Sequence, residues 1–217
     1  MNTELHRLYQ IKPGDTFRSR FAYASGYTPL PDRKSFEHPS MVERNRQFAE
    51  LNGYQPGIRI SREGSKWPDF LYCGGGDVTF FVSERVVADL RQAGIEIIDA
   101  TEFPIECIES RRTKLRLEDA PPYFVLEAPE EIEPNWVAMN IPTTPDGKLI
   151  SPIPTRSALE PFLYRTDTWS GRDLVSYVGI PQRLFCSERL KLYAAEKKWT
   201  NVEFDSIGMH SIRPRVS

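Results

Sequence analysis

The sequence predicts an α+β fold, with mixed or antiparallel sheets and two similar strand, capped helix, strand units. The main observation is a phrase that occurs twice: residues 80–86 read FFVSERV, and residues 184–190, 104 positions later, read LFCSERL. Each copy passes from an apolar stretch, through Ser-Glu-Arg, into a helical pattern and then a second apolar stretch. At 217 residues, the chain can form a single domain or two lobes, at about residues 1–126 and 127–217.

The N-terminal region combines one strand with turn-rich chain. We expect a strand at residues 5–11, followed by an extended stretch up to residue 40 that is broken by Pro, Gly and Asp. A short helix is predicted at residues 41–51, with Ser40 as its N-cap and Gly53 just beyond its end.

The first repeated unit is predicted to be a hairpin followed by a helix. Residues 69–73 and 78–82 are the strands, and a glycine-rich turn at residues 74–77 joins them. Ser83 stands where an N-cap belongs, and Glu84 adds negative charge at the positive end of the helix dipole. Gly94 fits the position just after the helix, and residues 95–98 are expected to form another strand.

The second unit follows the same order. Ser187 is the cap of the second helix, after the apolar residues 184–186. Residues 174–177, between the two copies, are expected to be a short helical or extended segment. Lysines at the helix end suit its negative pole, and residues 202–204 resume as a strand. Between the units we expect a strand or hairpin arm at residues 105–117 and a short strand at residues 123–126. A further hairpin is expected between residues 137–141 and 148–150.

Charge and cysteine content narrow the class of protein. The net charge is −2, from 28 basic and 30 acidic residues, so no general attraction to nucleic acid or to an anionic membrane is expected. The three cysteines are far apart and form no Cys-x-x-Cys pair, which favours thiols in a reducing compartment. The N-terminal residues lack a signal-peptide pattern, so we expect a cytoplasmic protein. The sequence leaves homo-oligomerisation open.

No reaction can be assigned from the motifs. The three histidines, His6, His38 and His210, stand in no nucleophile or metal-ligand pattern, and capping explains Ser83 and Ser187. We therefore expect no catalytic residue, no cofactor and no metal. An enzyme that uses one of these histidines with a nearby carboxylate is the first alternative, and a non-catalytic scaffold or regulatory module is the second.

An acidic segment ending in a tryptophan allows two interpretations. Its members are Glu127, Glu130, Glu131, Glu133 and Trp136. A solvated loop of charges is the simpler one, because charged loops need no partner. The other is a surface that binds a basic protein, with the tryptophan as an aromatic anchor and the carboxylates speeding encounter.

The two phrases resemble the Ser-Glu-Arg signature of a group of bacterial immunity proteins, which are encoded beside polymorphic toxins. The matching residues are Ser83, Glu84, Arg85, Ser187, Glu188 and Arg189, and the similarity spans about residues 69–207. Some proteins of that group carry a double Cys-x-x-Cys-Gly motif, which this chain lacks, so no metal role is carried over. The resemblance implies a cytoplasmic, non-catalytic protein that binds a cognate toxin domain and occludes its active site. We expect the six motif residues to serve the architecture, and we expect no nucleic-acid or membrane partner.

Overall fold

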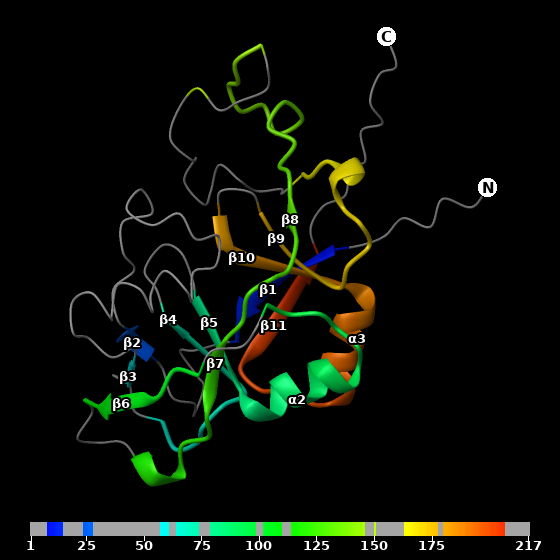
Figure 1. The fold of residues 1–217 in the computed structure, drawn as a ribbon. Helices are drawn as coiled ribbons and strands as arrows, with labels where there is room; N and C mark the ends of the chain where they lie inside the picture. Colours follow the sequence, from blue (N-terminus) through cyan, green and yellow to red (C-terminus); the bar gives the residue numbers. More distant parts are fainter. Residues whose placement is uncertain are drawn as a thin grey trace.

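The structure, a computed structural model, describes residues 8–14, 24–27, 57–60, 64–73, 79–98, 102–109, 114–145, 150, 163–177 and 180–206. Over this part of the chain, helices pack beside mixed and antiparallel sheets, which confirms the predicted α+β class (Figure 1). The helix predicted at residues 41–51, the glycine-rich turn at residues 74–77 and the three histidines lie outside these ranges.

The described strands form three sheets. The largest has, in spatial order, β11 (Val202–Ser206), β1 (Leu8–Pro13), β10 (Ile180–Ser187), β9 (Leu174–Tyr177) and β8 (Glu131–Ile132). The second has β4 (Phe70–Cys73), β5 (Thr79–Ser83) and β7 (Tyr123–Val125). The third has β2 (Ala24–Tyr27), β3 (Ile58–Ile60) and β6 (Ile105–Ile108). The helices are α2 (Glu84–Gln92) and α3 (Glu188–Glu196), with 3-10 turns η2 (Leu117–Asp119) and η4 (Thr166–Thr168).

The predicted repeat corresponds to a repeated hairpin and helix. Phe70 of β4 pairs with Val82 of β5, and Leu174 of β9 pairs with Cys186 of β10, so both pairings keep the offset of 104 residues. Each hairpin leads directly into its helix. A third antiparallel strand lies beside the second strand of each hairpin: β7 beside β5, and β1 beside β10. Because β1 comes from the N-terminal end of the chain, the five-stranded sheet combines segments from both ends of the sequence.

The two units differ after their helices. The second continues into β11, as predicted, and β11 pairs with β1. The strand predicted at residues 95–98 is wrong: the Ile95 amide closes the helix on Leu90 O at 2.9 Å, and the Ile98 amide donates to a loop carbonyl, Glu127 O, at 3.3 Å. These bonds leave the segment outside a strand ladder.

Two expectations between the units also need correction. Among the described residues of the predicted arm at 105–117, which are 105–109 and 114–117, the first four form a strand, and residue 117 begins a 3-10 turn. The strand predicted at residues 137–141 is instead a coil of turns. Its backbone bonds run to preceding residues: Met139 N donates to Asn135 O at 3.1 Å and Ile141 N to Trp136 O at 2.9 Å. The segment at residues 174–177, left open between helix and extended chain, is strand β9.

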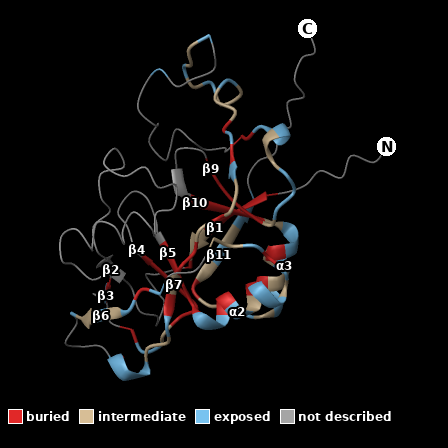
Figure 2. Cartoon of the chain, viewed as in Figure 1, coloured by how far each residue is buried: buried red, intermediate tan, exposed pale blue. Residues whose placement is uncertain are grey.

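Three apolar clusters form the core. The central cluster joins one face of each hairpin to the inner faces of both helices, and it includes Phe70, Val82, Leu90, Leu184 and Leu190. Strand alternation sends neighbouring side chains to the opposite faces, where two further clusters lie. One cluster packs the first hairpin against β3, and the other packs the second hairpin against β8 and Tyr164. Figure 2 shows buried residues concentrated on these strands and on parts of α2 and α3.

Candidate functional site

The first Ser-Glu-Arg phrase surrounds a buried carboxylate that the sequence analysis did not single out. Asp69, immediately before β4, is 8% exposed. Its carboxylate accepts from Ser83 Oγ at 3.2 Å, from Arg85 Nε at 2.9 Å, and from both the amide and the hydroxyl of Thr200 at 2.8 Å. Burial alone would raise the pKa of Asp69, but the hydrogen bonds from Arg85 and Thr200 outweigh it and hold that pKa below its ordinary value.

The second phrase repeats this arrangement around Asp173, before β9. Ser187 Oγ donates to the Asp173 carboxylate at 2.5 Å, and Arg189 Nε donates to the same group at 3.1 Å. The serine and the arginine follow the aspartate by 14 and 16 positions in both units. Burial would raise the pKa of Asp173, but the bonds from Arg189 and Ser187 lower it overall.

The two serines cap their helices differently. Ser187 Oγ accepts from Leu190 N at 3.2 Å, so the predicted side-chain cap is confirmed there. Ser83 occupies the N-cap position, but its side chain makes no capping bond, and its hydroxyl donates to Asp69. The side-chain cap predicted for Ser83 is therefore wrong. Glu84 and Glu188 are exposed in the first turns of their helices, and Tyr9 Oη donates to Glu188 at 3.4 Å.

Each arginine also reaches across to the other unit. Arg85 Nη1 donates to Lys197 O, at the C-terminal end of α3, at 3.1 Å. Arg189 Nη1 donates to Ala93 O, at the C-terminal end of α2, at 3.2 Å. A carbonyl at a helix end lacks an intrahelical donor, so each arginine supplies one to the opposite helix. Each arginine thus bonds both to the aspartate before its own hairpin and to the end of the other unit's helix. Figure 1 shows α2 and α3 lying next to each other.

This cluster is suited to architecture rather than to nucleophilic chemistry. Ser83 is 4% exposed, and both serine hydroxyls donate to carboxylates that the arginines already hold. A serine nucleophile needs an adjacent base that can take its proton, and an aspartate whose pKa is lowered is a weak base. The two serines and the two arginines of the motif therefore contribute to the framework in the described part of the chain.

The structure places the predicted acidic segment beside its own cationic partners. Glu130 accepts from Ser170 N at 2.7 Å and lies 3.9 Å from Arg172. Glu133 pairs with Arg165 at 2.6 Å. Both carboxylates thus have intramolecular partners, and Glu133 remains exposed to solvent beside its arginine.

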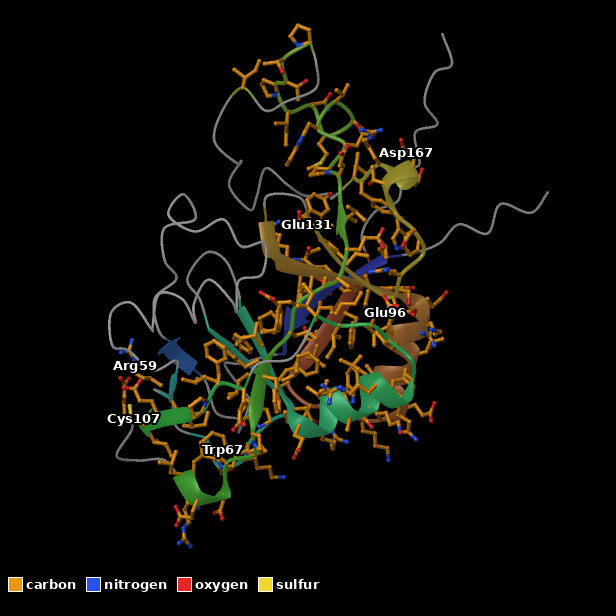
Figure 3. The ribbon with its side chains drawn as sticks, viewed as in Figure 1. Arg59, Trp67, Glu96, Cys107, Glu131 and Asp167 are labelled. Carbon is orange, nitrogen blue, oxygen red and sulfur yellow. The ribbon has the colours of Figure 1, made fainter. Side chains whose placement is uncertain are left out.

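The other members of the segment have varied surroundings. Glu127 is half-buried after β7, and Glu131 is exposed on β8, where Figure 3 labels it. Trp136 is partly buried and packs against the cluster around Tyr164 and Tyr177. Its indole therefore supports the fold, and this limits the surface it can offer as an anchor.

The exposed apolar side chains of this region are ones the sequence analysis missed. Val137 is 70% exposed and Ile150 is 64% exposed. Arg165 lies just before η4 and Asp167 lies on it, and the two side chains form an ion pair of 2.7 Å in the same region. The exposure of Val137 was not predicted, because the sequence analysis assigned this residue to a strand of a hairpin. No pattern in the sequence marks it as exposed.

The described part of the chain contains no cluster of side chains suited to a metal ion. The described residues contain no group of three or more His, Cys, Asp or Glu side chains able to hold a metal ion. Cys186 is fully buried, whereas Cys107, on β6, is half-buried. Among the described residues, no helix is both long and apolar enough to span a membrane.

Comparison with models of known protein families and with curated proteins finds no match to this chain. The resemblance to immunity proteins therefore depends on the two Ser-Glu-Arg phrases and their setting.

Proposed function

We propose that this chain is a non-catalytic immunity protein that binds a cognate bacterial toxin domain in the cytoplasm and neutralises it by occluding its active site. One observation carries this proposal: both Ser-Glu-Arg phrases lie at the same place in a repeated hairpin and helix, and both bind an aspartate at the same spacing. Chance matches to a three-residue signature have no reason to share a structural position. The duplicated setting therefore supports the resemblance.

The physical role of the motif agrees with a binding protein. Its charged groups are used in bonds within and between the two units, which makes a cross-braced framework. A rigid framework lowers the entropy lost on association, because the binding surface is ordered in advance. A blocking interface of standard size would bury about 1,600 Å² in total.

Co-expression is the direct test. The toxic domain encoded beside this gene is induced in bacterial cells with and without the chain, and growth is measured. We expect growth only when the chain is present, together with copurification of the two proteins. The control is the same toxic domain with an unrelated cytoplasmic protein. Arrest of growth despite expression of the folded chain would contradict the proposal.

An enzyme remains the competing function. His6, His38 and His210, on which that alternative depends, lie outside the described residues. Single His→Ala variants separate the two cases in the same growth assay. The proposal predicts undiminished protection by all three variants, whereas a required histidine would favour catalysis.

A further inference from the structure

The segment that follows β8 forms a coil held together by its own hydrogen bonds. Asn135 Oδ1 accepts from Ala138 N at 3.1 Å, and Val137 O accepts from Asn140 N at 3.1 Å. Asn140 has φ of 56°, a left-handed conformation that asparagine tolerates better than most residues. Ile150 N joins the coil by donating to Pro142 O at 3.3 Å. In Figure 1 this green segment projects from the rest of the described chain.

The coil is anchored on one side and apolar on the other. Trp136, Met139 and Ile141 pack against the cluster under β8 and β9. Val137 and Ile150 are the two most exposed of the large apolar side chains in the described ranges, followed by Leu192 on α3 at 62%. Apolar groups that a hydrogen-bonded coil holds in solvent favour burial against another molecule, because removing apolar surface from water is favourable.

Among the described residues, carboxylates outnumber guanidinium groups at the base of the coil. Arg165 pairs with Glu133 and Asp167, and Arg172 lies near Glu96 and Glu130, so four carboxylates share two guanidinium groups. Glu131 is an additional exposed carboxylate next to them. Figure 3 shows Glu131 and Asp167 below the coil, on β8 and η4.

We propose that this surface, with Val137 and Ile150 at its tip and Glu131, Glu133 and Asp167 at its base, docks a basic protein surface containing an apolar pocket. The inference rests on the proposed function and names the part of the toxin that is recognised: a cationic face, such as one that binds a polyanionic substrate. Complementary charge steers encounter, and the apolar pair supplies the contact energy. A second copy of this chain fits poorly, because its own acidic base would meet the same charges.

Affinity measurements with matched variants test this surface. The probe is the purified toxic domain encoded beside this gene, inactivated in its catalytic site, and binding is measured by calorimetry. We expect V137S/I150S to weaken binding by about 10- to 100-fold, because two apolar anchors are lost. Leu192→Ser removes an equally exposed apolar side chain from α3 and should change affinity by less than about twofold. Circular dichroism and urea midpoints check that each variant folds.

A charge variant tests the steering. Glu131→Lys should lower the association rate by about tenfold at low salt, and the loss should shrink at high salt, where charges are screened. Glu196→Lys, an exposed reversal on α3, is its control.

The outcomes separate the two proposals. If the natural chain binds and V137S/I150S binds equally well, the docking surface is wrong and the proposed function stands. The same holds if the double variant changes only self-association in sedimentation. If the natural chain neither binds nor protects, the proposed function is wrong, and this surface is overturned with it.

Discussion

Asp69 and Asp173 occupy equivalent places before their hairpins, yet their surroundings differ. Asp69 is almost fully buried and is held by Ser83, Arg85 and Thr200, whereas Asp173 is more exposed and is held by Ser187 and Arg189. A buried carboxylate depends more on its partners, because water cannot replace them. The structure therefore assigns more stabilisation to the first cluster.

Isosteric substitution measures this difference. Asp69→Asn should lower the free energy of unfolding by about 2–4 kcal/mol, because the buried amide cannot accept all the hydrogen bonds that Ser83, Arg85 and Thr200 donate to the carboxylate, and Asp173→Asn by about 1–2 kcal/mol. Urea denaturation at neutral pH gives both values. An equal or smaller loss for Asp69→Asn would show that burial does not rank the two clusters.

The equivalence of the two aspartates is visible in the sequence itself. Applying the offset of 104 positions to Asp69 leads directly to Asp173, so the pair was recoverable from the sequence. The choice of Asp69 as the partner of Ser83 was not, because only the β4–β5 pairing brings residues 14 positions apart together. Trp136 illustrates the opposite error: its polar neighbours suggested exposure, but the apolar cluster under β8 covers it.

At the scale of the element, the helices α2 and α3 brace each other through their ends. Both end in a left-handed residue, Gly94 with φ of 66° and Lys198 with φ of 55°, and both receive an arginine from the other unit. Asp89 on α2 adds further contacts, since it accepts from Trp199 Nε1 at 2.8 Å and lies 3.5 Å from Lys197. The helix ends are thus stabilised by tertiary contacts as well as by local caps.

Arg→Lys variants test the crossed contacts. Lysine keeps the charge but cannot bind an aspartate and a carbonyl with one planar group. Arg85→Lys should speed amide exchange about three- to tenfold at the end of α3, and Arg189→Lys should do so at the end of α2. Exchange is followed by mass spectrometry, with Arg91→Lys, exposed on α2, as the control. Faster exchange confined to the substituted helix would contradict the crossed arrangement.

The sequence predicted the elements better than their pairing. Apolar runs and Ser-Glu-Arg predicted the first hairpin and both helices, because these signals are local, whereas the pairing of β9 with β10 was not predicted. The placement of β1 between β10 and β11 depends on contacts over most of the chain length, which one sequence does not reveal. Residues 95–98 show the same limit, since an apolar run forms a strand only where a neighbouring strand is available.

At the scale of the whole molecule, the lowered pKa values make stability depend on pH. Asp69 and Asp173 both have a folded-state pKa below the ordinary 3.8. Their contribution is therefore present above about pH 4, and it is lost as the pH falls from there through the folded-state values. Urea midpoints at pH 7, 5 and 3 should fall mainly between pH 5 and 3, and less steeply in Asp69→Asn. The same slope in that variant would exclude Asp69 as a source.

The central cluster follows the sequence repeat more closely than the two outer clusters do. The central cluster is built from equivalent strands and helices of both units, whereas different segments cover the two outer clusters. The projecting coil belongs to one of those covers, and the residues 104 positions before it lie outside the described ranges. We expect stability to depend on the duplicated framework and recognition, under the proposed function, to depend on the coil.

Titration of the active toxic domain with the purified chain tests the central claim most directly. The toxin is held at a concentration well above the dissociation constant, and its activity is measured as the chain is added. Occlusion of the active site predicts a linear fall in activity that reaches zero at about one chain per toxic domain. Full toxin activity in a large excess of folded chain would contradict the account.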